Sequence, residues 1–369
     1  MRVHFHFMVL AAALACAATA VAQDFDSPVL VEPNAALQTD DADDASTYFI
    51  TDEEPAPAAP APAANAACAC DDACATCGGC APACGCCASC CQSVGSWFDN
   101  TLITLGAEGY KSVGDTFPPP GLATGYMASA GFVGGFNTGF SVGLDKIRGQ
   151  IGGSYGIYDV KGRDTASPSS AEQQYFLTAG LYKRSDVLAG DRASWGVVYD
   201  QFWDHQWGLF ADELYVGQFR GIAGWAMSEW NEIGVWGALH STVDYSTVAY
   251  GPGPVRAMNQ YNMYWRHNYN FGGQTMLYFG GVDPADVGSW QLGGTGLAPL
   301  GDWLAMYGNC TFAFPSSSTG PVGSNELQWN FGAGLVMYLG GKAVSPTVSG
   351  YKGLPLLPVA NNGSMLITN

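Results

Sequence analysis

The stretch Trp329–Leu339 reads W-N-F-G-A-G-L-V-M-Y-L, and it decides the fold. Every odd position of this stretch is apolar, whereas the even positions hold Asn330, two glycines, Val336 and Tyr338. Alternation with a period of two predicts a β-strand that has one apolar face and one face of small or polar side chains. Such a strand fits a sheet that has lipid on its outside and water on its inside.

The same alternation recurs through the second two-thirds of the chain. In 146–159 the odd positions include Ile147 and Ile151, and the even positions begin with Arg148 and Gln150. If a weaker candidate at 288–294 is included, we predict twelve strands, at 101–111, 127–138, 146–159, 172–184, 193–204, 213–226, 230–243, 255–269, 273–282, 288–294, 301–314 and 325–340. Twelve is an even number, as single-chain bacterial barrels require.

The connections between these segments also alternate. The links that follow even-numbered strands are mostly short, as at Met227–Glu229 and Asn270–Gly272, and most links after odd-numbered strands are longer. Short turns on the periplasmic side and longer loops on the outer side are typical of outer-membrane barrels.

Composition agrees with this fold class. Charged residues make up 12% of the 369 residues, and glycine occurs 49 times. The only long apolar run, Val9–Ala22, is shorter than the about 20 residues that a spanning helix needs. We therefore predict an all-β protein, an antiparallel transmembrane β-barrel of about twelve strands preceded by a disordered acidic and Cys-rich arm. A secreted soluble β-sandwich that acts as a binding module stays open as an alternative, because its strands also alternate.

Five regions are expected along the chain: a signal peptide at 1–22, an acidic Pro/Ala-rich linker at 23–67, a Cys-rich segment at 68–96, the barrel at 97–340 and a C-terminal periplasmic tail at 341–369. Arg2, the apolar run after it and the Ala20-Val21-Ala22 cleavage motif indicate export by a cleaved signal peptide. A lipoprotein signal at Cys16 is the alternative. Two alternatives are open for the tail: either the barrel's assembly signal is internal, at Met337–Leu339, or the tail folds back as a plug or as a periplasmic strap.

The Cys-rich segment holds ten of the twelve cysteines. Some of them have Cys-x-x-Cys spacing, but the segment contains no His, so disulfides within or between chains are favoured over metal binding or unstructured low complexity. The disulfide candidates are Cys68, Cys70, Cys74, Cys77, Cys80, Cys84, Cys86, Cys87, Cys90 and Cys91. Adjacent cysteines cannot easily all pair locally, which makes cross-linking to the cell wall or to neighbouring envelope proteins a further hypothesis.

The net charge of −18 is concentrated before the barrel, where residues 23–96 contain twelve acidic residues and no Lys or Arg. This distribution excludes a basic nucleic-acid surface. It also argues against electrostatic docking on anionic lipid, so the expected lipid partner, the outer membrane, is contacted through the apolar faces of the barrel.

Polar residues opposite the greasy faces are the candidates for lining the lumen: Arg148, Gln150, Asp200, Gln218, Arg220, Glu232 and Arg266. In an open barrel such charges would select solutes, and in a narrow one they would only fill and stiffen the interior. His205, His240 and His267 lack the spacing of a zinc motif, so we predict no catalytic residue, no cofactor and no metal. Tryptophans at the predicted strand ends (Trp195, Trp203, Trp207, Trp225, Trp230 and Trp290) indicate interfacial girdles, with a carbohydrate platform as the alternative.

Several of these segments resemble a known family. Gln174–Arg184, Trp195–Asp200, Gly217–Gly221, Asn231–Trp236 and the tail Leu357–Leu366 are similar, in order, to a planctomycete-type family of outer-membrane β-barrel proteins of unknown function. The resemblance covers about residues 100–369 and implies a barrel in the cell outer membrane. It implies no activity and no site.

Two functional readings follow for a membrane barrel. The protein is a small passive diffusion pore with a periplasmic Cys-rich tether, or it is a structural cell-envelope anchor that is cross-linked through cysteines and transports nothing.

Overall fold

The computed structural model describes residues 98–112, 128–144, 146–160, 171–208, 212–246, 253–283, 288–314, 327–351 and 353–368. The predicted signal peptide, the acidic linker and all ten disulfide candidates lie outside these residues. Among the described residues, no helix is long and apolar enough to cross a membrane.

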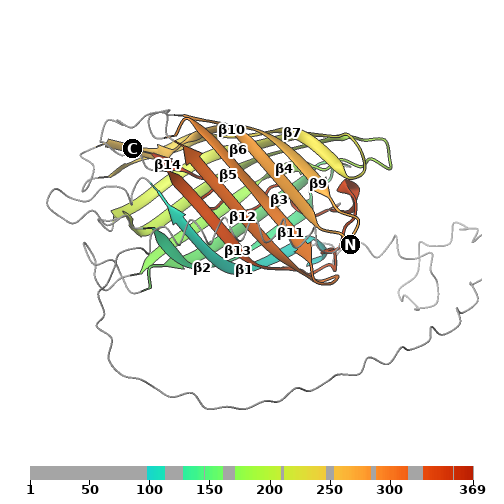
Figure 1. The fold of residues 1–369 in the computed structure, drawn as a ribbon, viewed down its shortest axis with the longest axis horizontal. Coiled ribbons are helices and arrows are strands. Elements are labelled where there is room, and N and C mark those ends of the chain that lie inside the picture. Colours follow the sequence, from blue (N-terminus) through green and yellow to red (C-terminus); the bar gives the residue numbers. More distant parts are fainter. Residues whose placement is uncertain are drawn as a thin grey trace, which may run out of the picture. The chain divides into compact units, whose positions relative to one another are not determined.

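Twelve antiparallel strands close into a barrel (Figure 1). They are β1 (Thr101–Lys111), β2 (Ser129–Ser141), β3 (Arg148–Tyr158), β4 (Glu172–Lys183), β5 (Ala193–Trp207), β6 (Asp212–Ala226), β7 (Asn231–Ser246), β9 (Asn259–Asn268), β10 (Gln274–Asp283), β11 (Trp290–Pro299), β12 (Leu304–Phe314) and β13 (Gln328–Tyr338). The ring closes where β1 pairs with β13, with Leu102 opposite Tyr338 and Lys111 opposite Trp329. The predicted fold class is confirmed, and the β-sandwich alternative is wrong because the sheet has no two packed layers but pairs back onto itself.

Two strands differ from the sequence prediction. The weak candidate at 288–294 is a full barrel strand, β11, that continues to Pro299. The predicted strand at 255–269 is instead two strands, β8 (Gly253–Ala257) and β9, which are separated at Met258. The N–H of Met258 donates to Leu366 O at 2.7 Å, a contact with the distant tail that the local pattern does not contain.

Inward and outward faces alternate along the strands. On β3 and β4, even-numbered side chains such as Gln150 and Gln174 are buried, and odd-numbered ones such as Ile151 and Leu177 are exposed. Three inward tyrosines lie directly opposite glycines of a neighbouring strand, at Tyr264–Gly234, Tyr278–Gly293 and Tyr307–Gly334. A glycine leaves room for the ring to lie along the wall, which frees space in the centre of the barrel.

The two mouths of the barrel differ. We call the end that carries the connections 142–147, 184–192, 227–230, 269–273 and 300–303 the short-turn mouth. β1 starts at this mouth and β13 ends there. The other ends of the strands form the opposite mouth, and most residues of the connections between them are outside the described ranges.

The tail after β13 folds back onto the barrel as both a strap and a plug, and its periplasmic location stays a prediction. Residues 342–351, which include η6 (Val348–Tyr351), cross the short-turn mouth as a strap. Residues 353–368 then run through the lumen as a plug and end in β14 (Ile367–Thr368), which pairs with β8 at the opposite mouth. Figure 1 shows β14 at one end of the barrel and the short red coil of η6 at the other.

The plug organises the buried apolar side chains of the described residues, which form four clusters. Each cluster contains tail residues: Met365 and Ile367 in the first, Leu356 and Leu357 in the second, Leu354 in the third and Leu366 in the fourth. The interior of this barrel is therefore a packed core with the tail at its centre.

Candidate functional site: the occupied lumen

Six of the seven predicted lumen residues point inward and are almost fully buried: Gln150, Asp200, Gln218, Arg220, Glu232 and Arg266. The seventh, Arg148, is half-buried at the start of β3, on the inward register. The structure brings four of them (Gln150, Asp200, Gln218 and Arg220) to the tail or to its immediate partners, and it pairs Glu232 with Arg266 on the wall.

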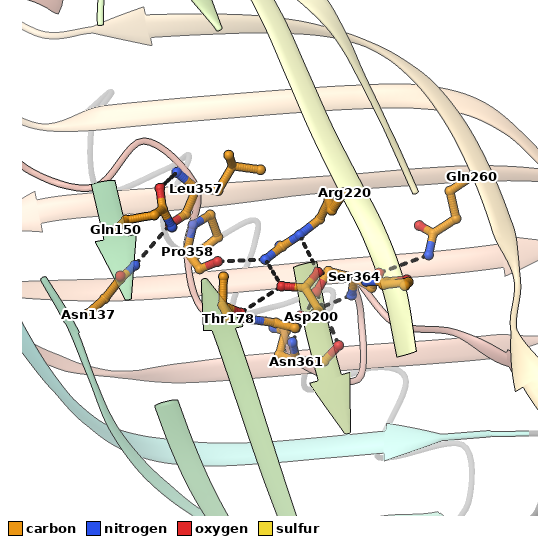
Figure 2. Close-up of polar contacts among 12 residues, drawn as sticks. Asn137, Gln150, Thr178, Asp200, Arg220, Gln260, Leu357, Pro358, Asn361 and Ser364 are labelled. Carbon is orange, nitrogen blue, oxygen red and sulfur yellow. Dashed lines mark hydrogen bonds and ion pairs between the residues drawn. The ribbon is translucent and has the colours of Figure 1, made fainter. Parts of the chain in front are cut away.

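Leu357 of the tail is held between β2 and β3 (Figure 2). Its carbonyl accepts hydrogen bonds from Asn137 Nδ2 at 2.9 Å and from Gln150 Nε2 at 3.0 Å. Its N–H donates in return to Gln150 Oε1 at 3.3 Å. The side-chain amide of Gln150 therefore pairs with the tail backbone much as a neighbouring strand would.

A buried ion pair lies beside the next tail residue. Arg220 of β6 and Asp200 of β5 are in contact through two pairs of atoms, Nε to Oδ2 at 2.9 Å and Nη2 to Oδ1 at 3.1 Å. Arg220 Nη2 also donates to the carbonyl of Pro358 at 2.7 Å. The carboxylate has a further donor in Thr178, whose Oγ1 accepts from the N–H of Ala360. Both charges are thus neutralised and bonded, which a buried ion pair needs in order to be tolerated.

A tight turn follows at Asn361–Ser364, deeper in the lumen (Figure 2). Ser364 N–H donates to Asn361 Oδ1, and Asn361 N–H donates to Ser364 Oγ. The carbonyl of Ser364 accepts from Gln218 and from Gln260, each at 3.0 Å, so the turn is bound from β6 and from β9.

Near the short-turn mouth, Arg184 donates to the carbonyls of Leu354 and Pro355. Burial lowers the pKa of Arg184 to about 10, with a further lowering from nearby Arg266, so the guanidinium stays protonated at neutral pH. Tyr351 lies against the same guanidinium, and burial raises the pKa of its phenol to about 12. Both groups therefore keep one protonation state across the physiological range.

The strap connects to the turns of that mouth. Ala343 N–H donates to Asp302 O, and Val348 N–H donates to Glu229 O. Tyr351 Oη donates to Gly272 O at 3.0 Å. The strap also contacts the start of the barrel, where Lys342 Nζ lies 2.7 Å from Asn100 Oδ1. These contacts fix the residues that lead into the plug.

Two further polar groups belong to the wall. Glu232 accepts from Arg266, Tyr264 and Ser194, and none of these is bonded to the tail in the contacts described. A second group, closer to the opposite mouth, contains three buried carboxylates with tyrosine, glutamine and asparagine partners, and it includes Glu108, Tyr158, Glu172, Gln174, Asp204 and Asn330. Asn362 of the tail donates to Gln174 Oε1 in this group at 2.8 Å.

Sequence reasoning missed several of the residues that hold the tail, among them Asn137, Thr178 and Gln260. Gln260 shares its parity and its predicted segment with the lumen candidate Arg266, and Thr178 lies on the same face of β4 as Gln174. Asn137 lies on β2, whose odd face points inward. The sequence therefore indicates which side chains of a strand point inward, from their odd or even position. It does not indicate which of these inward side chains contacts the tail.

The histidines do not form a common site. His205 interacts with Glu213, His240 with Asn259 and Arg256, and His267 with Asn231. Within the described ranges, no group of three or more His, Cys, Asp or Glu residues is arranged to hold a metal ion. The absence of an enzymatic activity stays a prediction.

Solved structures with a similar strand arrangement are membrane barrels. Outer membrane phospholipase A from Escherichia coli matches with 9% identity and a TM-score of 0.38, over 64% of this chain and 95% of its own. The NanC porin matches with 9% identity and a TM-score of 0.34, over 64% and 98%. The anion-selective porin from Comamonas acidovorans matches with 10% identity and a TM-score of 0.29, over 64% and 98%. These values are too low to transfer an activity or a location.

No curated protein matches the chain. A family model does match, over residues 100–367, and the matched range includes the twelve strands and all but the last residue of the plug. The expectation of a family of unknown function is thereby confirmed, and a planctomycete origin stays a prediction. The chain belongs to the family of unknown function DUF6666.

Proposed function

We propose that this protein is a sealed barrel of the outer membrane that anchors envelope material and does not conduct solutes. The observation that carries the proposal is the plug, because tail residues occupy the lumen and belong to all four buried apolar clusters. A diffusion pore needs a continuous water-filled path, and the tail residues lie in the lumen where such a path would run.

Membrane insertion is supported by the outward faces. Large apolar side chains are exposed around the wall, including Phe132, Leu177, Met263, Phe279 and Leu335. An apolar surface of this extent on a soluble protein would need a partner to cover it. A bilayer covers it without one, because every strand of the closed ring has its backbone groups paired.

Aromatic side chains near the strand ends support the same placement. Trp290 stacks on Phe314 with 3.9 Å between ring centroids, and Trp225, Trp230 and Trp303 are exposed near the short-turn mouth. Indole rings favour the interface between hydrocarbon and water. Trp207, which the sequence assigned to this group, is buried in the lumen instead.

The anchoring part of the proposal rests on the sequence before the barrel. That sequence holds the acidic linker and the ten clustered cysteines, and β1 starts at the short-turn mouth. If the cysteines join the barrel to wall or envelope proteins, replacing all ten with Ser leaves barrel assembly intact and removes cross-linked species from non-reducing gels. Unchanged gels would contradict the cross-linking.

Conductance tests the sealed state. Purified full-length protein in planar bilayers is expected to give no stable conductance steps. The positive control is an open porin that is purified and inserted by the same procedure and does conduct. Insertion is verified in parallel by heat-modifiable gel mobility of protein recovered from vesicles. Reproducible open steps from the inserted full-length protein would overturn the proposal and favour the diffusion pore.

A further inference from the structure

The tail is recognised mainly through its backbone. Wall side chains donate to the carbonyls of Gly353, Leu354, Leu357, Pro358, Ser364 and Ile367, in an order that follows the tail from the short-turn mouth to the opposite mouth. The donors come from β2, β3, β4, β6, β9 and β13 and from Arg184, the residue after β4. Donors distributed around a channel in this way suit the binding of a peptide through its carbonyl groups.

Apolar side chains of the tail complete the recognition. Leu356 and Leu357 pack with Tyr182, Val198 and Ile222, and Met365 and Ile367 pack with Phe176 and Phe202. At the far end, Ile367 and Thr368 add a strand to β8, with Ile367 opposite Ala257. Strand addition with side-chain pockets is a known mode of peptide recognition.

The covalent connection from β13 to the plug runs through one turn and the strap. After Tyr338 the chain passes through a turn with Gly341 at a φ of 65°, and the strap is then held by its own contacts. None of the contacts of residues 353–368 described above requires the peptide bonds of that turn.

We propose that the lumen is a peptide-binding channel whose resident ligand is residues 353–368, and that it binds this segment as a separate peptide. The inference rests on the sealed lumen proposed above and extends it, since it assigns a binding activity to the wall. The ligand class is a peptide with a turn at the position of Asn361–Ser364 and apolar side chains at the positions of Leu356, Leu357, Met365 and Ile367.

The first experiment cuts the connection in the folded protein. A protease recognition sequence is inserted between Gly340 and Gly341 of the full chain, and the folded protein is cut in detergent. The released segment is expected to co-elute with the barrel in size-exclusion chromatography, as it does in the uncut control. Prompt loss of the segment from a barrel that keeps its heat-modifiable mobility would overturn the inference, and it would leave the sealed state of the intact chain untouched.

The second experiment asks for binding in trans. The cut protein is unfolded in urea and diluted into detergent with an excess of fluorescent peptide of sequence 341–369. The labelled peptide is expected to co-elute with the refolded barrel, whereas a scrambled peptide of the same composition is excluded. A barrel that refolds without the labelled peptide, or that refolds only from uncut chain, would contradict a separable ligand.

Matched variants test the mode of recognition. Gln150→Met removes the reciprocal pair with Leu357, and Gln173→Met changes a glutamine that bonds Tyr155 on the wall. Dissociation of the labelled peptide is expected to be about thirtyfold faster for Gln150→Met, in line with the loss of two typical hydrogen bonds. It should be unchanged for Gln173→Met. Equal dissociation rates in both variants would count against backbone recognition.

Discussion

Gln150 and Leu357 exchange two hydrogen bonds although they lie 207 residues apart in the chain. The donor–acceptor distances are 3.0 Å from Gln150 Nε2 to Leu357 O and 3.3 Å from Leu357 N to Gln150 Oε1. A barrel wall has no unpaired backbone groups to offer a chain in its lumen, because its strands already pair with each other. Side-chain amides provide the substitute, which explains why buried glutamine and asparagine are so frequent on the inner face.

The buried pair of Asp200 and Arg220 gives the first prediction. Asp200→Ala leaves the guanidinium buried without its carboxylate, and breaking such a pair costs about 3–5 kcal/mol of unfolding free energy. Urea unfolding in detergent, followed by intrinsic fluorescence, measures this loss. The control is Lys146→Ala, because Lys146 pairs with Asp191 at the short-turn mouth and is largely exposed. Its expected cost is about 0–1 kcal/mol. If both variants lost a similar amount of unfolding free energy, the ion pair of Asp200 and Arg220 would not be a buried pair that supports the plug.

The outward assignment of Leu335 gives the second prediction. Leu335 of β13 is 43% exposed on the outer wall, and Leu181 of β4 is 46% exposed. An Arg at either position is expected to cost about 2–4 kcal/mol if the site faces the middle of a bilayer. Yields of folded, membrane-inserted protein report the effect, with Leu335→Met as the control that keeps an apolar side chain. Wild-type yields for Leu335→Arg would refute the lipid-facing assignment.

The third prediction concerns two glycines of β11. A methyl group on Gly293 would lie 2.2 Å from Tyr278 Oη and 2.6 Å from Cys310 O, whereas one on Gly296 would meet nothing within 4 Å. Gly293→Ala is therefore expected to lose about 1–3 kcal/mol through overpacking. Gly296→Ala should leave the stability close to that of the wild type. Thermal unfolding of the two variants in the same detergent separates them, and equal melting temperatures would contradict the packing of Tyr278 over Gly293.

The fourth prediction concerns the path of the plug. An epitope placed after Thr368 should be accessible from the same side of the membrane as one placed between Val160 and Ala171, because both lie at the mouth opposite the short turns. An epitope placed at Ser228, in a short turn, should be accessible only from the other side. Antibody labelling of intact and permeabilised cells makes the comparison. If the epitope after Thr368 and the epitope at Ser228 were labelled from the same side of the membrane, the tail would not pass through the lumen.

Much of the ring could be predicted from local pattern alone. Alternation is a property of each strand by itself, so the segments and their inward faces were visible without knowledge of their partners. β11 was the weak case because Gly293, Gly294 and Gly296 dilute its alternation. The break between β8 and β9 could not be predicted from the local sequence, because it depends on the hydrogen bond from the N–H of Met258 to the carbonyl of Leu366 in the tail.

The site was less predictable because the tail has no alternation to read. Pro355 and Pro358 interrupt it, and its apolar residues meet side chains from most strands of the ring. Trp207 shows a second limit. Gln206 has a φ of 76°, and the register shifts between His205 and Trp207, so the ring of Trp207 turns inward against the parity of β5.

The clamp between Lys342 and Asn100 has a mechanical consequence. Asn100 immediately precedes β1, so the chain before the barrel enters the wall at this clamp. A force that is applied to the chain before Asn100, and directed away from the short-turn mouth, acts along the axis of β1. This strand is hydrogen-bonded to β2 on one side and to β13 on the other. Tension then loads both ladders in shear, with many bonds sharing the force at once, instead of opening them one by one.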